Sequence, residues 1–406
     1  MKQIWIKCIR TVLLSLLVSS CSMELLEHKE TQSAPIQVGI HAGGVQTRTE
    51  MLQNGLSAMW NAGDEIAVWA LGSNGRYILS NQVFETYGLD DGHAYFTSVL
   101  DSPMPEGRYT YYCSYPAPLS ATGTVLDFML PTEQDGKVSG GADIMLATPV
   151  SHGALTPLKE EEDHSGMTLE MNRMLHQFRF RVPAENHLLD GTSIERMVLT
   201  FPVPVAGNVQ MDASNPSKAP VLTSGYKEIT LDLKEPISSA RQNYACVALL
   251  PVTFPQGQSL QIKAYTSDKI VKIDPVDLRG KTCLPGHSTP VMLMVKSVSE
   301  FPYRLTVKVG SNNLGEDPNS IRIQAPAGCI WPGSNSNVFT YAPGHKVRTG
   351  EEIVFKFEDE AQYRAFSNKT LSVTYDSDNT ITYQSVKMPD LSSNDKGSIS
   401  LTVPYL

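Results

Sequence analysis

The chain has 406 residues, with 42 Asp and Glu against 33 Lys and Arg, which gives a formal net charge of −9. This acidic balance argues against nucleic acid as a partner, because phosphates attract a basic surface. The length exceeds what one hydrophobic core normally serves and predicts two or three domains. The 29 Gly and 26 Pro residues predict many turns between short elements.

Residues 1–20 have the organisation of a secretory signal peptide. Three basic residues within the first ten are followed by an apolar run from Val12 to Val18, and two serines then precede Cys21. A basic region, a short apolar region and small residues before a cut are typical of export. The run is well short of the roughly 20 residues that span a bilayer.

The order apolar-Ser-Ser-Cys that ends at Cys21 resembles the site at which a bacterial lipoprotein signal is cut and the thiol acylated. The resemblance implies an outer-membrane lipoprotein exposed at the cell surface, held by more than one acyl chain because one chain binds only marginally. An ordinary signal peptide with an incidental cysteine is the alternative. Residues 21–34 are polar without periodicity and are interpreted as a tether.

From residue 35 onward the chain consists mostly of short segments in which apolar and polar residues alternate. Ile36, Val38 and Ile40 alternate with polar or small neighbours, and the same pattern recurs at 178–182, 229–233 and 260–264. Alternation with a period of two predicts strands with one buried face. We expect an all-β protein of tandem antiparallel β-sandwich domains, transthyretin-like or Ig-like, without a long helix.

We expect three domains after the tether. The first covers 35–183 and ends after the strand pattern QFRFRV, and the second covers 184–298. Residues 299–406 contain seven strand signals, which is the size of a complete sandwich and predicts a third domain that could bind a ligand.

Four cysteines follow Cys21, and none has a metal-binding spacing. Export permits disulfides, and Cys246 with Cys283 is the pair expected, because both fall in the second domain. Four buried free thiols are the other expectation, since cysteine is often buried when unpaired.

A search for catalytic motifs finds no HExxH, GxSxG, P-loop or GxGxxG pattern, so we expect no catalytic residues, no metal and no cofactor. The acidic run at 159–164 is interpreted as a solvated loop, and Asp376 starts a hairpin turn rather than a calcium loop. Trp331 lies in GCIWPGSNSN, where flanking Gly and Pro predict an exposed loop. Its ring is a candidate for stacking on a sugar.

The order and spacing of five stretches resemble the fimbrillin-like proteins of Bacteroides-type bacteria, which are subunits and accessory proteins of lipoprotein-derived pili. The stretches are IQVGIHAGGVQTRTE (36–50), WNAGDEIAVWA (60–70), YTYYCSYPAP (109–118), ADIMLATPV (142–150) and LEMNRMLHQFRFRV (169–182). The resemblance covers 35–183 well and 190–296 loosely, and it does not extend to 300–406.

The resemblance implies an assembly mechanism. In such pilins a trypsin-like protease cuts after an arginine that follows the first strand, and Arg48 before Thr49 matches that position. The cut would release Cys21 with the strand that contains Ile36, Val38 and Ile40. A strand from another subunit could then fill the groove, with about four apolar side chains contributing on the order of 6–12 kcal/mol. Alternatively, Arg48 is an ordinary exposed residue.

The role within a pilus stays open at this stage. Ile399, Leu401 and Val403 alternate cleanly and could form a donor strand, or they could complete the third domain, which would suit a terminal tip or accessory subunit. The expected partners are other pilus subunits, the outer membrane through the lipid, and a glycan or protein ligand of host or bacterial origin. Two alternatives remain: an anchor with Arg48 uncut, and a glycan-binding surface lipoprotein that does not polymerise.

Overall fold

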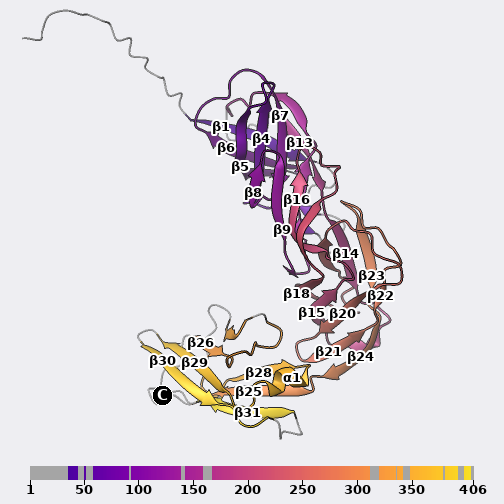
Figure 1. The fold of residues 1–406 in the computed structure, drawn as a ribbon, viewed down its shortest axis with the longest axis vertical. Helices are drawn as coiled ribbons and strands as arrows, with labels where there is room; N and C mark the ends of the chain where they lie inside the picture. The colour runs from indigo at the N-terminus through magenta and orange to yellow at the C-terminus, as the bar shows by residue number, and fades with distance from the viewer. Residues whose placement is uncertain are drawn as a thin grey trace, which may run out of the picture.

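The protein is described from a computed structural model, which covers residues 35–43, 50–51, 58–90, 93–138, 142–158, 167–310, 320–334, 336–341, 348–377, 380–391 and 397–403. The expected fold class is confirmed, because strands dominate these residues and the only α-helix among them is α1 (Glu360–Arg364). Figure 1 shows sheets that follow one another along a curved arrangement from β1 to β31. In the part of the chain described, no helix is long and apolar enough to cross a membrane.

The N-terminal sheet closes on itself. Its order is β11-β13-β1-β6-β5-β4-β7, and β7 pairs again with β11, while β12 pairs with the rest of β7. A closed sheet has no free edges. The strands are β1 (Ile36–Gly43), β4 (Glu65–Gly72), β5 (Tyr77–Asp90), β6 (His93–Leu100), β7 (Arg108–Tyr115), β11 (Met145–Ala147), β12 (Val150–Gly153) and β13 (Met167–Arg173). The short strands β2 (Glu50–Met51) and β3 (Ala58–Met59) pair with each other.

A four-stranded sheet connects the first and second parts of the chain. Its order is β17-β16-β9-β8, so two hairpins that lie far apart in the sequence share it. One buried apolar cluster accordingly contains Trp69, Phe128 and Val209 together with Phe178. The strands are β8 (Ser120–Thr122), β9 (Val125–Leu130), β16 (Ala206–Asp212) and β17 (Val221–Tyr226).

The strand expected to end the first domain instead pairs with the second. β14 (His176–Arg181) lies between β19 (Ala245–Leu249) and β23 (Ser288–Met292). The alternation in QFRFRV predicted the strand correctly, but pairing partners more than 60 residues away leave no mark in a local pattern. The partners of β14 thus lie in the segment 184–298, and the boundary at 183 stays a prediction.

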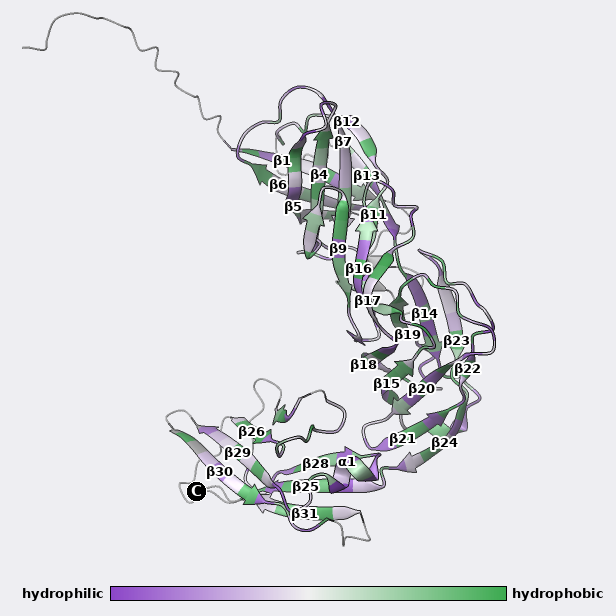
Figure 2. Cartoon of the chain, in the orientation of Figure 1, coloured by the Kyte–Doolittle hydropathy of each residue, from purple (hydrophilic) through white to green (hydrophobic). Residues whose placement is uncertain are grey.

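The middle sheet has the order β10-β18-β15-β20-β21-β24, with β22 also paired to β20. Its strands are β10 (Glu133–Gln134), β15 (Ile194–Thr200), β18 (Glu228–Ile237), β20 (Ser259–Tyr265), β21 (Lys269–Ile273), β22 (Val276–Asp277) and β24 (Val295–Glu300). A short 3-10 turn, His187–Leu189, precedes β15. Figure 2 shows green and purple segments mixed along these strands, as expected for sheets with one wet face.

All seven strands predicted in the C-terminal region are present and form two sheets, β28-β25-β31 and β27-β26-β29-β30. They are β25 (Tyr303–Val309), β26 (Ser320–Gln324), β27 (Val338–Thr340), β28 (Glu352–Phe357), β29 (Thr370–Ser377), β30 (Thr380–Lys387) and β31 (Ser398–Val403). A separate buried cluster that includes Phe355, Phe357 and Tyr363 lies between the sheets. Asp359 caps α1 by accepting a hydrogen bond from the Ala361 amide.

A buried ion pair fixes the end of β13 beside β14. Arg173 Nε lies 3.0 Å from Asp143 Oδ1 and Nη2 lies 3.0 Å from Oδ2, while the two side chains are 10% and 1% exposed. Burial raises the pKa of Asp143 to about 7, although Arg173 acts in the opposite direction. The carboxylate therefore depends on Arg173 to stay charged.

Replacing Arg173 with Met should reduce the free energy of unfolding by about 3–5 kcal/mol at pH 8, because the buried Asp143 loses the partner that lets it stay charged. The folded state raises the pKa of Asp143, so it favours the protonated carboxyl. The contribution of this group to the free energy of unfolding is therefore lost as the pH rises through that pKa. Urea unfolding of Arg173→Met at pH 5 should therefore show a smaller loss than at pH 8. A loss that does not depend on pH would contradict this account of Asp143.

Candidate functional site

Strand β1 is an internal member of the closed N-terminal sheet. It pairs antiparallel with β6 from Ile36↔Leu100 to Ala42↔Ala94, and parallel with β13 from Ile40↔Met167 to Gly43↔Glu170. Both of its edges are therefore engaged. We call the space that β1 fills, between β6 on one side and β13 with Pro157–Leu158 on the other, the β1 groove.

The inward face of β1 is fully buried. Val38, Ile40 and Ala42 are 0% exposed and belong to the core of the closed sheet, and Ile36 packs against that core while half-buried. On the opposite face, Gln37 is exposed and His41 meets the Tyr95 ring edge-on, with centroids 4.6 Å apart. The residues predicted as the displaced strand, Ile36, Val38 and Ile40, thus all point into the sheet.

Pro157 and Leu158 complete the groove where β13 does not reach. Val38 forms a bridge with Pro157, and the Leu158 amide donates to the Gln37 carbonyl at 2.9 Å. A Cβ at Gly39 would lie 2.9 Å from Leu158 Cδ2, so this position accepts only glycine without a shift of Leu158. On the β6 side, the Thr97 hydroxyl donates to the Val38 carbonyl at 3.1 Å. The fit is close along the whole strand.

The chain links β1 to the rest of the protein at one point. β1 ends at Gly43 and β2 begins at Glu50. Arg48 and Thr49 fall between these strands and, like Cys21, lie outside the described residues. A cut after Arg48 would leave all of β1 on the N-terminal fragment, held only by noncovalent contacts.

The predicted donor residues lie in β31, which pairs in parallel with β25 inside the C-terminal sandwich. Val403 is fully buried, Ile399 and Leu401 are half-buried, and the Gly310 amide donates to the Val403 carbonyl at 2.8 Å. β31 is an edge strand of its sheet. In this structure it completes its own domain, which is one of the two arrangements that the sequence left open.

The expectation that Trp331 offers its ring to a ligand is wrong. The side chain is 2% exposed, its ring stacks on Phe355 with centroids 3.8 Å apart, and Nε1 donates to the Ile323 carbonyl at 2.9 Å. Flanking Gly and Pro correctly predicted a loop, but they do not determine which way a side chain points. The large apolar side chain that is exposed beside it is that of Ile330.

The structure agrees with the expectation of four buried free thiols and not with that of a disulfide. Cys113, Cys246, Cys283 and Cys329 are buried free thiols, so the pair Cys246 and Cys283 forms no disulfide. Cys246 is on β19, whereas Cys283 follows β22. Burial raises the pKa of Cys246 to about 12 and that of Cys283 to about 11, which keeps both protonated and unreactive at neutral pH.

Among the residues the structure describes, no group of three His, Cys, Asp or Glu side chains could hold a metal ion. The acidic run at 159–164 lies outside these residues. Asp376 is near the end of β29, whose pairing with β30 reaches Ser377↔Thr380, as expected for a hairpin.

Comparison with known proteins finds no matching family model and no matching curated protein. Solved structures similar to this chain include a candidate cell adhesion protein from Bacteroides uniformis, at 14% identity over 65% of this chain and 97% of that one, with a TM-score of 0.42. A second candidate cell adhesion protein, from Bacteroides ovatus, is 13% identical over 66% of this chain and 98% of that one, with a TM-score of 0.42. A fimbrial protein from Bacteroides ovatus is 13% identical over 64% of this chain and 48% of that one, with a TM-score of 0.33. These are remote similarities.

Replacing Ile40 with Ala should lower the free energy of unfolding of the uncut protein by about 2–5 kcal/mol, because the closed sheet cannot fully refill the space. The matched control is Gln37→Ala on the exposed face of the same strand, which should change it by less than about 0.5 kcal/mol. Urea unfolding followed by intrinsic fluorescence measures both. Equal effects would contradict the assignment of the inward face.

Replacing Trp331 with Ala should lower the free energy of unfolding by about 3–5 kcal/mol, because it removes a ring from the core of the C-terminal sandwich. The neighbouring exposed residue provides the comparison, since Ile330→Ala should be nearly neutral. Thermal unfolding of the two variants distinguishes a core role from a surface role. A stable Trp331→Ala protein would restore the surface interpretation.

Proposed function

We propose that this protein is a lipid-delivered cell-surface fimbrial subunit, in a tip or accessory position, that acts in adhesion. In this proposal the precursor is exported, acylated at Cys21 and cut after Arg48. Another subunit then supplies a strand that replaces β1. The observation that carries the proposal is the position of β1 as a buried, internal strand connected to the rest of the fold only through residues 44–49.

Loss of β1 would open the closed sheet and leave two unpaired edges, on β6 and β13, above an apolar floor. Val38 and Ile40 are fully buried, Ala42 is small and Ile36 is half-buried. Burial of these side chains contributes about 4–8 kcal/mol, which is less than the sequence alone implied because Ala42 is small and Ile36 is half-buried. A replacement strand with alternating apolar residues would recover this energy together with both hydrogen-bond ladders.

The arrangement of β31 supports a terminal position. Its three apolar residues serve the core of their own sandwich, and Val403 is bonded through its carbonyl to Gly310. A subunit that keeps this strand can accept a strand but not pass one onward. Such a subunit belongs at the end of a fibre, with its C-terminal sandwich free for contact with a ligand.

Treating the purified precursor with a trypsin-like protease should produce a new N-terminus at Thr49, measured by N-terminal sequencing. The fragment should stay bound until mild denaturant releases it, because noncovalent contacts alone hold β1 after the cut. A synthetic donor peptide with alternating apolar residues should then raise the unfolding temperature of the cut protein. The Ile40→Ala substitution should not affect this complemented form, since β1 is no longer part of it.

Arg48→Ala is the matched control and should resist the cut while folding normally. A product that starts elsewhere than Thr49, or a cut protein that binds no donor peptide, would contradict strand exchange. Uncut protein recovered from the outer membrane with acyl chains on Cys21 would favour the anchor role instead. The alternative of a glycan-binding lipoprotein that does not polymerise no longer has Trp331 in its support.

A further inference from the structure

A large cleft separates the middle sheet from the C-terminal sandwich. Its volume is about 1820 Å³, and residues of both parts line it. One wall consists of the wet faces of β18, β15 and β20. The other consists of β28 with parts of the segments 330–334 and 338–340. We call this space the interdomain cleft.

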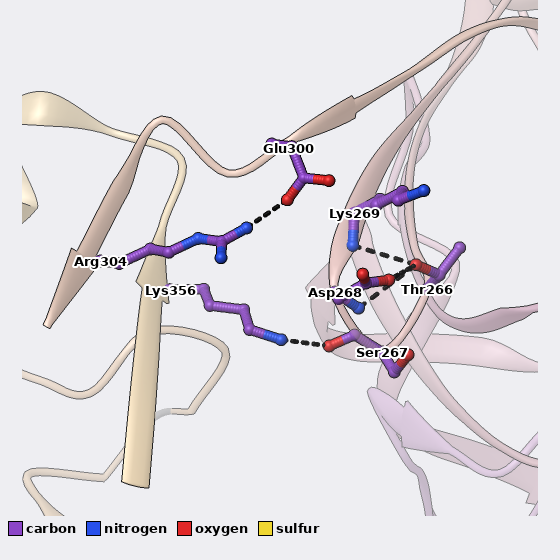
Figure 3. A network of polar contacts seen from close by, with 7 residues as sticks. All are labelled: Thr266, Ser267, Asp268, Lys269, Glu300, Arg304 and Lys356. Atoms are coloured by element: carbon purple, nitrogen blue, oxygen red, sulfur yellow. Dashed lines mark hydrogen bonds and ion pairs between the residues drawn. The ribbon is translucent and has the colours of Figure 1, made fainter. Parts of the chain in front are cut away.

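Direct contacts join the two walls at several points. Arg196 on β15 donates to the Gly333 carbonyl, and Lys263 on β20 pairs with Glu358 at 3.6 Å. Lys356 Nζ on β28 donates to the Ser267 carbonyl at 2.6 Å, and Arg304 on β25 pairs with Glu300 at the end of β24 (Figure 3). The Tyr265 hydroxyl donates to Glu358 Oε2 at 2.9 Å. Burial and the bond to Glu358 raise the pKa of Tyr265, so this hydroxyl stays a donor at neutral pH.

The sheet wall presents hydrogen-bonding side chains in cross-strand rows. Asp232, Arg196 and Tyr265 form one row, and Thr230, Val198 and Lys263 form the next. Charged and hydroxyl side chains of three neighbouring strands therefore line this wall around Val198, and Arg196, Tyr265 and Lys263 among them already contact the opposite wall. These strands are internal to their sheet, so their backbone groups are already paired and only side chains are offered.

The opposite wall and the rim add apolar and aromatic surface. Val354 on β28 is 41% exposed, Ile330 is 51% exposed, and Tyr226 is 54% exposed. Phe301, which stacks on Tyr265 with centroids 5.9 Å apart, also lines the cleft. A ligand held here would therefore meet polar groups together with exposed apolar and aromatic side chains.

The charges of the cleft indicate the class of ligand. The basic and acidic lining residues are nearly balanced: Arg196, Lys227, Lys234, Lys263 and Lys356 against Glu133, Glu195, Glu228, Asp232, Glu358 and Asp359. Neither a polyanion nor a polycation fits such a balance. A neutral molecule with many hydroxyl groups and apolar ring faces fits both walls, because hydroxyls donate and accept.

We propose that the interdomain cleft binds an uncharged oligosaccharide. This proposal rests on the proposed function, because it names the class of ligand that the adhesive subunit would bind. It does not require strand exchange. An extended peptide is the competing occupant, since β28 is an edge strand. The end of that edge is already engaged, since Lys356 donates to the Ser267 carbonyl and Glu358 contacts Tyr265 and Lys263, which favours the sugar.

The test uses the uncut full-length chain carrying Arg48→Ala, so failure of strand exchange cannot affect the result. An array of neutral and sulfated oligosaccharides is screened first, and the neutral glycan bound best is titrated by calorimetry. Tyr226→Ala should weaken binding by about tenfold, as expected for loss of one ring contact. Val198→Trp, which fills the sheet wall, should abolish binding.

The matched control is Tyr383→Ala, since Tyr383 on β30 is 73% exposed and does not line the cleft. It should bind like the parent chain. The proposal is overturned if no neutral glycan binds, if sulfated glycans bind better, or if the two cleft variants bind normally. It is also overturned if an extended peptide competes with the glycan more strongly than free glycan does. Should Val198→Trp fail to fold, Tyr226→Ala against Tyr383→Ala decides the outcome.

Discussion

The N-terminal part of this protein depends on closure of its sheet by β1. Seven strands form a ring of hydrogen bonds, and β1 supplies two of its contacts, to β6 and to β13. Closure removes the edges that would otherwise pair with other chains. Because the inward side chains of the same strand also fill the core, one segment protects both the edges and the apolar interior. Removing β1 would therefore expose the edges of β6 and β13 and the apolar interior together.

The rest of the chain makes such an opening tolerable. The four-stranded sheet β17-β16-β9-β8 joins the first part to the second, and their shared core extends from Ala67 to Val295. This core lies apart from the cluster that contains Val38 and Ile40. A protein that lost β1 would keep the larger cluster intact. Opening of the N-terminal sheet is thus separated from unfolding of the whole chain.

The sequence predicted strands well and their partners poorly, for a physical reason. Alternation of apolar residues is a local property, and it located all seven strands of the C-terminal sandwich and the inward face of β1. Pairing is set by contacts over long separations, so the partners of β14 and the sheet shared by β9 and β16 could not be predicted. The parallel pairing of β1 with β13 was missed for the same reason.

Side-chain direction in loops is the other property that composition does not determine. Trp331 is flanked by residues typical of a turn, yet its ring fills the space beside Phe355. A large aromatic ring contributes more to stability when buried than when exposed, and the Trp331 indole N–H donates to the Ile323 carbonyl. The proposed glycan site is the interdomain cleft, assembled from strands whose polar faces looked like ordinary wet faces in the sequence. The two ends of the chain thus differ in kind: β1 fills a groove that another strand could take, whereas β31 is committed to the sandwich that forms one wall of the cleft.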